Sequence, residues 1–180
     1  MQIGAMPLLD GLRTTHSKIH GYGVVTTRPF KRGDIVVYGD GVLYREADEF
    51  DDEYALVLPG YELDDDGNEG PPLYYDLTCQ TRWINHACEP NTEVDTSWDE
   101  RRERAIAWWV ATRDIPVGEE LAYDYAFSAH LAIPCLCGQE LCRGVIADED
   151  ELHLVPEDMR KYVRERFRHK LVAPAATAAE

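Results

Sequence analysis

The residues best suited to chemistry lie in one ten-residue stretch, Arg82–Asn91, near the middle of the 180-residue chain. It holds the adjacent pair Asn85–His86 and Cys88, next to the apolar pair Trp83–Ile84. Its Asn and Pro residues interrupt regular structure, while the apolar pair favours burial. The stretch therefore predicts a short, buried, irregular segment whose polar groups need partners inside the protein. Use of Cys88 and His86 as a hydrolase dyad is disfavoured, because closeness in sequence does not imply a shared hydrogen bond.

Three of the five cysteines crowd into eight positions, as Cys135, Cys137 and Cys142. Thiolates so close together repel one another, and a soft divalent ion relieves that repulsion. A fourth ligand could be Cys88, Cys79 or a histidine. No His-Glu pair accompanies the cluster, so a structural zinc is favoured over a catalytic one, with disulfide or redox use as the alternative.

The elements that must position these residues are predicted to be short strands and turns in one domain. Gly21, Tyr22 and Gly23 indicate a tight turn entering a strand, or a backbone that approaches a ligand closely. Segment 104–112 is apolar on both faces, which places it centrally in a sheet. The alternating helices of a nucleotide-binding α/β fold are missing from the pattern. Strands are predicted at 35–38, 42–44, 54–58, 73–77, 92–97 and 104–112, the last two as a hairpin.

The two ends of the chain differ from this pattern. Residues 1–15 show no clear periodicity and are interpreted as a lead-in. In 156–171, Met159, Val163, Phe167 and Leu171 recur every four residues after Pro156, which predicts an amphipathic helix with a basic outer face. The alanine-rich tail that follows is expected to fray.

The formal net charge of -16 is high for this length. Acidic runs lie at 46–53, 64–66 and 148–151, and solvated loops are their simplest interpretation. A negative field would also attract a basic partner and repel phosphate, which disfavours direct nucleic-acid binding. No run reaches the roughly 18 apolar residues of a membrane span, and the N-terminus lacks the features of a secretory signal. An intracellular protein is expected, with the cytoplasm favoured and the nucleus as the alternative.

Four segments, in order, resemble one family. Gly21–Gly23 is similar to its Gly-x-Gly, Arg82–Asn91 to its Arg-Phe-Ile-Asn-His-Ser-Cys-x-Pro-Asn signature, Gly118–Tyr125 to Gly-Glu-Glu-Leu-x-Phe-Asp-Tyr, and Cys135–Gly144 to a trailing cysteine module. The family is that of SET-domain protein lysine methyltransferases with a post-SET motif. Ala87 replaces the usual serine of the signature.

The resemblance implies a mainly β fold, the β-clip SET fold, with small curved sheets and a knot-like crossing where the two signature segments meet. It implies a catalytic domain at 16–130 and a zinc-binding post-SET segment at 131–147, which lie between the lead-in at 1–15 and a C-terminal helix and tail at 148–180. It also implies S-adenosylmethionine as methyl donor and structural Zn²⁺. The expected cofactor-binding residues are Gly21, Tyr22, Gly23, Arg82, Asn85 and His86, the catalytic residue is Tyr125, and the zinc ligands are Cys88, Cys135, Cys137 and Cys142.

The implied reaction is methyl transfer to a lysine of a basic, histone-like protein. The amine must be neutral to attack, and desolvation and the nearby sulfonium charge favour that form. Tyr54 is a further aromatic candidate for the lysine channel. Tyr123 stands where many family members have phenylalanine, which predicts mainly mono- or dimethyllysine. The alternative is a catalytically silent, zinc-stabilised module that binds a basic peptide. The oligomeric state is not indicated by the sequence.

Overall fold

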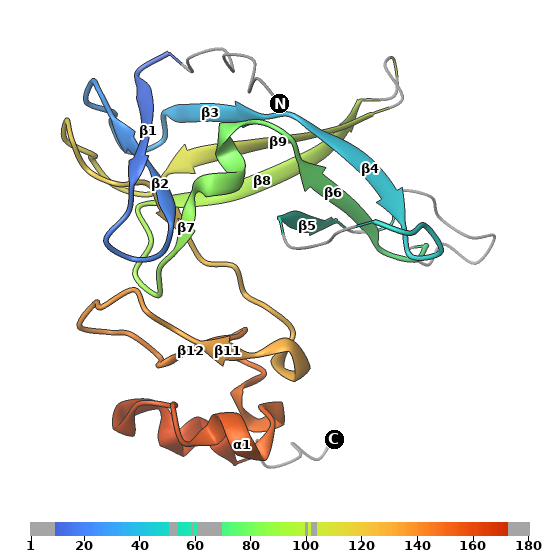
Figure 1. The fold of residues 1–180 in the computed structure, drawn as a ribbon, viewed down its shortest axis with the longest axis vertical. Coiled ribbons are helices and arrows are strands. Elements are labelled where there is room, and N and C mark those ends of the chain that lie inside the picture. Colours follow the sequence, from blue (N-terminus) through green and yellow to red (C-terminus); the bar gives the residue numbers. More distant parts are fainter. Residues whose placement is uncertain are drawn as a thin grey trace, which may run out of the picture.

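The structure is a computed structural model that describes residues 10–50, 54–58, 60, 70–99, 101 and 104–172. The acidic stretches 51–53 and 64–66 and the tail 173–180 lie outside the described residues. Small β-sheets form one part of the molecule, and the C-terminal third packs below them in the view of Figure 1. No helix among the described residues is long and apolar enough to cross a membrane.

Two three-stranded antiparallel sheets form the main framework. One has the order β3-β9-β8 and the other β4-β6-β5. The strands are β3 (Ile35–Gly39), β4 (Gly41–Arg45), β5 (Ala55–Leu58), β6 (Leu73–Leu77), β8 (Thr92–Asp99) and β9 (Arg104–Ala111). All six strands predicted from apolar runs are present, and β8 and β9 form the predicted hairpin.

Strand β9 is central in its sheet, as its apolar sequence predicts. Its alternate side chains face the main core, where Ala107 and Trp109 are fully buried. The side chains on its other face, among them Trp108, are only half-buried, so the sheet is covered on one side more than on the other. This core also contains Leu58 and Leu77 of the β4-β6-β5 sheet, so it joins both three-stranded sheets. Ile84 and Ile115, from segments between the strands, complete it.

Three two-stranded sheets complete the β structure. They are β1 (Leu12–His16) with β2 (Tyr22–Thr26), β7 (Asn85–His86) with β10 (Ala122–Tyr123), and β11 (Ile133–Pro134) with β12 (Val145–Ile146). The pairing of β7 with β10 is parallel and joins the two signature segments, as the mainly β fold requires. All but the last residue of strand β1 falls in the range interpreted as a patternless lead-in, because its mixed Leu-Arg-Thr-Thr-His sequence gives little apolar signal.

The predicted continuous helix over 156–171 is wrong. A single α-helical turn, α1 (Glu157–Arg160), is followed by a 3-10 helix at Glu165–Leu171, and shorter 3-10 helices lie at Gln80–Trp83, Ala129–Leu131 and Leu152–Leu154. Arg164 has an extended backbone, and its N–H donates to the Arg143 carbonyl at 2.9 Å, outside any helical ladder. This tertiary hydrogen bond interrupts the helix where the local sequence would continue it.

The apolar residues that predicted the helix nevertheless share one face. Val163 is fully buried, and Met159, Phe167 and Leu171 pack against the same cluster. That cluster also contains Val145 and Ala147, which follow the cysteine motif. The cysteine segment and the C-terminal segment therefore bury one common core.

Candidate active site and metal centre

The glycine turn, Gly21–Gly23, lies at the start of β2 and is held by the amide of Asn85. Asn85 Nδ2 donates to the Tyr22 carbonyl at 2.8 Å, to the His20 carbonyl at 3.2 Å and to Glu120 Oε1 at 3.0 Å. Glu120 Oε1 also accepts from the Ser17 hydroxyl at 2.7 Å. The turn is thus fixed to both signature segments.

Gly21 and Gly23 meet different needs in this turn. Gly21 has a φ of 47°, in the region that favours glycine. A Cβ on Gly23 would lie 2.3 Å from Glu120 Oε1, so only glycine lets this carboxylate reach Asn85. Between them the Tyr22 ring is exposed and stacks on His16 with ring centroids 4.9 Å apart. The result is a backbone turn held by hydrogen bonds, with an exposed aromatic residue at its centre.

His86 lies between the cysteine cluster and Tyr125. Its Nδ1 accepts the Tyr125 N–H at 3.2 Å, so its Nε2 carries the proton and donates to Cys88 Sγ at 3.4 Å. Its ring also contacts the Tyr125 ring edge-on, with centroids 5.4 Å apart. His86 is almost fully buried, so it links Cys88 to Tyr125 inside the protein and does not face solvent.

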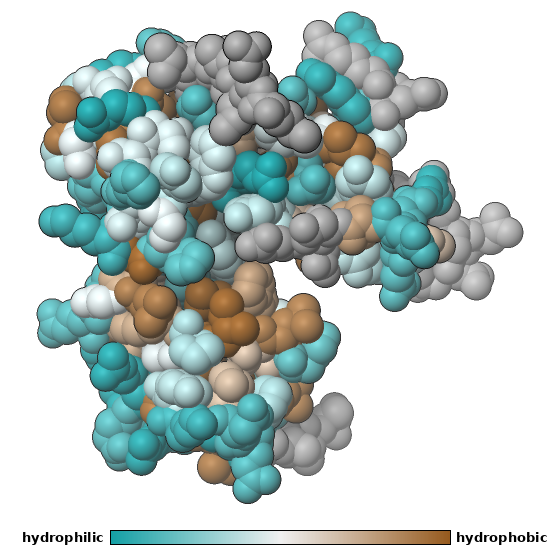
Figure 2. Space-filling model, in the orientation of Figure 1, coloured by the Kyte–Doolittle hydropathy of each residue, from teal (hydrophilic) through white to brown (hydrophobic). Residues whose placement is uncertain are grey.

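A cleft of about 440 Å³ lies next to Tyr125. Tyr54, Tyr123 and Tyr125 all line it, together with Phe127 and aliphatic residues of β5. The apolar surface below the sheets in Figure 2 lies at the level of segment 126–136, which carries the exposed Leu131, Ile133 and Leu136. The charged residues in the lining are Arg82 and Asp124, one of each sign.

Tyr125 and Tyr123 share a wall of the cleft, with ring centroids 4.8 Å apart. The Tyr125 hydroxyl donates to the Ile84 carbonyl at 2.9 Å. Burial, reinforced by the nearby Tyr54, raises the pKa of Tyr125 above its ordinary value, and burial raises the pKa of Tyr123 even more clearly. Both phenols are therefore neutral in any physiological buffer.

Arg82 lies with the cleft residues. Its guanidinium sits 4.2 Å over the Tyr54 ring, a cation–π contact at the cleft wall. Of the other predicted cofactor residues, Asn85 lies at the glycine turn with Gly21, Tyr22 and Gly23, whereas His86 lies between Cys88 and Tyr125. The predicted site thus has two parts, the glycine turn and the cleft. Asn85 contacts the turn, Tyr125 lines the cleft, and His86, next to Asn85, contacts Tyr125.

The four predicted zinc ligands converge. Sulfur atoms of Cys88, Cys135, Cys137 and Cys142 all lie within 4.8 Å of one another, and Cys88 Sγ is 3.8 Å from Cys135 Sγ. Four thiolates at about 2.3 Å from a tetrahedral zinc lie about 3.8 Å apart, so this donor set fits the ion. Cys79 is elsewhere, where its sulfur accepts the Asp40 N–H at 3.2 Å.

Main-chain donors support these sulfurs as thiolates. N–H groups of Cys137, Arg143 and Gly144 point to the sulfurs of Cys135, Cys88 and Cys142, at 3.3–3.4 Å. The Cys135 thiol, His86 and Arg143 together lower the pKa of Cys88 to about 3, against the effect of burial. The neighbouring thiolate and burial raise the pKa of Cys135. A bound divalent cation would remove this conflict by holding all four as thiolates.

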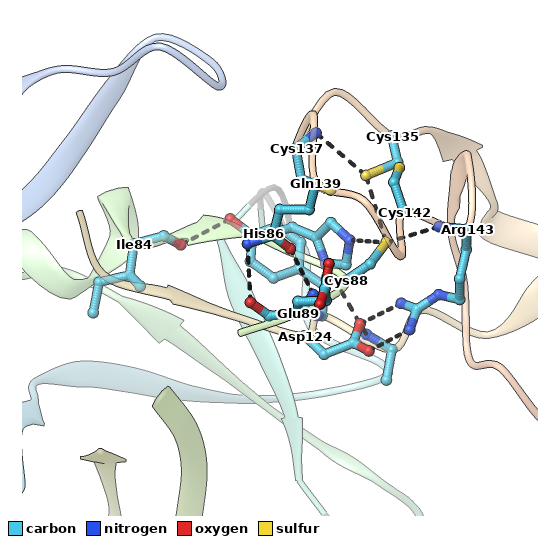
Figure 3. Close-up of polar contacts among 12 residues, drawn as sticks. Ile84, His86, Cys88, Glu89, Asp124, Cys135, Cys137, Gln139, Cys142 and Arg143 are labelled. Atoms are coloured by element: carbon cyan, nitrogen blue, oxygen red, sulfur yellow. Dashed lines mark hydrogen bonds and ion pairs between the residues drawn. The ribbon is translucent and has the colours of Figure 1, made fainter. Parts of the chain in front are cut away.

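Some residues at this junction are not found by sequence reasoning. Glu120 and Asp124 lie inside one recognised motif and Arg143 inside another, but a motif does not show which side chains meet. Arg143 donates both terminal nitrogens to Asp124, each at 2.6 Å (Figure 3). Nineteen positions separate this pair in sequence.

Comparison with known proteins agrees with this mainly β fold and its paired signature segments. Residues 21–126 match the SET domain family, and the chain belongs to that family. It is 32% identical over 140 residues to the histone-lysine N-methyltransferase, H3 lysine-4 specific, of Schizosaccharomyces pombe, covering 72% of this chain and 14% of that protein. It is also 32% identical over 143 residues to the histone-lysine N-methyltransferase trithorax of Drosophila melanogaster, covering 74% of this chain and 4% of that protein.

The chain therefore spans a small fraction of the length of these curated relatives. Among solved structures, it shares its fold with Arabidopsis thaliana SUVH6 in complex with SAM, with a TM-score of 0.61 and 22% identity. That match covers 75% of this chain and 33% of SUVH6.

Proposed function

We propose that this chain is an S-adenosylmethionine-dependent protein-lysine N-methyltransferase that acts on a basic protein such as a histone. The observation that carries the proposal is the parallel pairing of β7 with β10. It joins Asn85, which holds the glycine turn, and His86, which contacts Tyr125, to the segment whose Tyr123 and Tyr125 line the cleft. Relatives named histone-lysine N-methyltransferases support the same reaction.

The glycine turn offers the features that a nucleoside-bearing methyl donor needs. Bound S-adenosylmethionine would supply an electrophilic methyl group on a positively charged sulfur. Gly21–Gly23, Asn85 and His86 would hold it, with the exposed Tyr22 ring as a stacking face. Asn85 fixes the backbone of the turn before any ligand arrives, so little ordering is left to accompany binding.

The cleft offers a site for the substrate lysine. Its rings and aliphatic side chains would desolvate the ammonium group and lower the pKa of the lysine, which favours the neutral amine. Tyr125 would orient the amine toward the methyl group, since its hydroxyl is already anchored at the Ile84 carbonyl. The chain then accelerates the reaction mainly by positioning the two reactants.

The four cysteines would hold a structural zinc. All four tetrahedral positions would be filled by protein sulfur, which leaves none open for chemistry. The ion would fix the segment after β10 against the signature segment, beside the cleft.

Tyr123 supports a finer proposal, that mono- and dimethyllysine are the main products. Its ring lies beside Tyr125 and packs edge-on against Trp109 at 5.7 Å, so it has little freedom to move. A hydroxyl in this wall would hold the amine, or a water next to it, in space that further methyl groups would need.

The proposed substrate and location rest on charge and on the names of the relatives. Relatives named for histone H3 and a net charge of -16 both favour a basic protein. The same names favour an intracellular setting that includes the nucleus, and nothing in them supports the cytoplasmic preference drawn from the sequence.

Calorimetry with S-adenosylmethionine tests the proposal against the alternative of a silent peptide-binding module. The enzyme should bind it with one site per chain, and Asn85→Ala should lose that binding because the turn carbonyls are released. A labelled methyl group should then pass to lysine in histones or lysine-rich peptides. Absence of binding by the zinc-loaded protein would favour the silent module.

A further inference from the structure

Asp124 occupies the position between the two cleft tyrosines, and its carboxylate organises the backbone around them. Its Oδ1 accepts the Ala126 N–H at 3.1 Å, just after Tyr125. Ala126 has a φ of 44°, a conformation that residues with a side chain rarely adopt. The course of the chain through Tyr125 therefore depends on a contact to Asp124.

Arg143, which lies in the cysteine segment, binds the same Asp124 carboxylate. Its two terminal nitrogens contact the two carboxylate oxygens at 2.6 Å each, a bidentate arrangement that fixes orientation as well as distance. The Arg143 side chain is 4% exposed, and that of Asp124 is 30% exposed. The charge of Arg143 is thus buried and paired directly with the Asp124 carboxylate.

The main chain of Arg143 is part of the cysteine cluster. Its N–H donates to Cys88 Sγ at 3.3 Å, and it directly follows Cys142. Its carbonyl accepts the Arg164 N–H from the C-terminal segment. Figure 3 shows Arg143 reaching from the cysteines to Asp124, beneath Cys88 and His86.

We propose that the Arg143–Asp124 ion pair is a positioning strut that couples occupancy of the cysteine site to the placement of Tyr123 and Tyr125. Metal binding fixes the backbone at Cys142–Arg143, the guanidinium fixes Asp124, and Asp124 fixes the tyrosine-bearing segment. The catalytic consequence rests on the function proposed above, whereas the mechanical link does not. Coupling between two sites is reciprocal, so a change at Asp124 must also weaken metal binding, although Asp124 supplies no ligand.

The test combines three variants with two readouts that need no activity. Asp124→Asn removes the negative charge of the carboxylate. Arg143→Lys keeps the positive charge but removes the guanidinium group that contacts both carboxylate oxygens. Arg113→Lys is the matched control, because Arg113 pairs with Glu119 on the approach to the same segment but away from the cysteines. Zinc affinity is measured by chelator competition, and amide hydrogen exchange is followed over 122–127 with zinc and after chelation.

In the unmodified protein, chelation should increase exchange over 122–127. In Asp124→Asn and Arg143→Lys, exchange should already be high with zinc bound and should respond little to chelation. Both variants should lose about tenfold in zinc affinity, the scale seen when groups that support metal ligands are removed. Arg113→Lys should match the unmodified protein in both readouts.

Kinetics add a third readout if methyl transfer is established. Both strut variants should lower kcat about tenfold with little change in the KM for S-adenosylmethionine, and the double variant should be no worse than the poorer single one. The proposal is overturned if the variants lower only the melting temperature, with unchanged zinc affinity and a normal exchange response. If no methyl transfer is found at all, the proposed function fails. The exchange and zinc results still decide whether the Arg143–Asp124 pair couples the cysteine site to the tyrosine-bearing segment.

Discussion

At the scale of single residues, Tyr123 and Tyr125 carry most of the chemical argument. Alternate residues of an extended segment share a face, and the structure places both rings on the wall of one cleft. That outcome follows from the motif and the strand geometry. The partners of these rings do not follow from the motif, because Trp109 lies in β9 and Tyr54 lies just before β5, both outside the motif.

Tyr123→Phe should shift the products toward di- and trimethyllysine. The change removes one hydroxyl and keeps the ring that packs on Trp109, so it frees space without loosening the wall. Intact-peptide mass spectrometry after extended incubation would show the shift. Trimethyllysine as the main product of the unmodified enzyme would refute the role given to this hydroxyl.

The raised pKa values of Tyr123 and Tyr125 predict a loss of stability in alkali. Tyrosines of the unfolded chain ionise near pH 10, whereas these two stay protonated in the folded protein. Below that pH they have no effect, and above it each should lower the free energy of unfolding by about 1.4 kcal/mol per pH unit.

Urea unfolding between pH 9 and 11 measures this slope. In Tyr123→Phe, the fall of the free energy of unfolding above pH 10 should be smaller by the contribution of one tyrosine, about 1.4 kcal/mol per pH unit. An identical slope in Tyr123→Phe and the unmodified protein would contradict the assignment.

At the scale of elements, the strands follow from their apolar runs, because short β-branched and aromatic stretches between turn residues have few alternatives. The C-terminal helix fails for the opposite reason. A four-residue apolar period predicts one continuous α-helix, whereas the chain forms α1 and a separate 3-10 helix, with the hydrogen bond from Arg164 to Arg143 at the break between them. Tertiary contacts of this kind are invisible in a single sequence.

The cysteine segment is held to the end of β7 by polar contacts as well as by sulfur. The Glu89 N–H donates to Gln139 Oε1 at 2.6 Å, and Gln139 Nε2 donates back to the Glu89 carbonyl at 2.9 Å. These contacts bring Cys88 to the cluster, and they explain why it, and not Cys79, completes the set. The sequence alone left both open.

The chain should therefore carry one zinc, and Cys88→Ser should lose most of it. Cys79→Ser should keep the metal, because that sulfur lies with Asp40 and Thr81 instead. Elemental analysis of protein purified without chelator gives the stoichiometry for both variants. Loss of zinc in Cys79→Ser but not in Cys88→Ser would reverse the assignment.

At the scale of the whole molecule, charge is the dominant feature. The cleft lining holds one basic and one acidic residue, so any attraction of a basic substrate must come from the wider surface. Attraction between exposed charges is screened beyond about 8–10 Å at physiological salt.

The KM for a lysine-rich substrate should consequently rise several-fold as salt is increased, while the KM for S-adenosylmethionine changes little. Initial rates at a series of salt concentrations test this, with a peptide of lower positive charge as the control. A substrate KM that ignores salt would leave solubility as the only role of the acidic runs.

Methyl transfer by Tyr125→Phe, compared with the unmodified protein, tests the central claim most directly. The variant lacks only the hydroxyl that contacts the Ile84 carbonyl at the cleft. Transfer of a labelled methyl group from S-adenosylmethionine to a lysine-rich peptide should fall about tenfold or more. Calorimetric affinity for S-adenosylmethionine should stay within about twofold, because the glycine turn and Asn85 are untouched. Undiminished turnover in the variant would contradict the account.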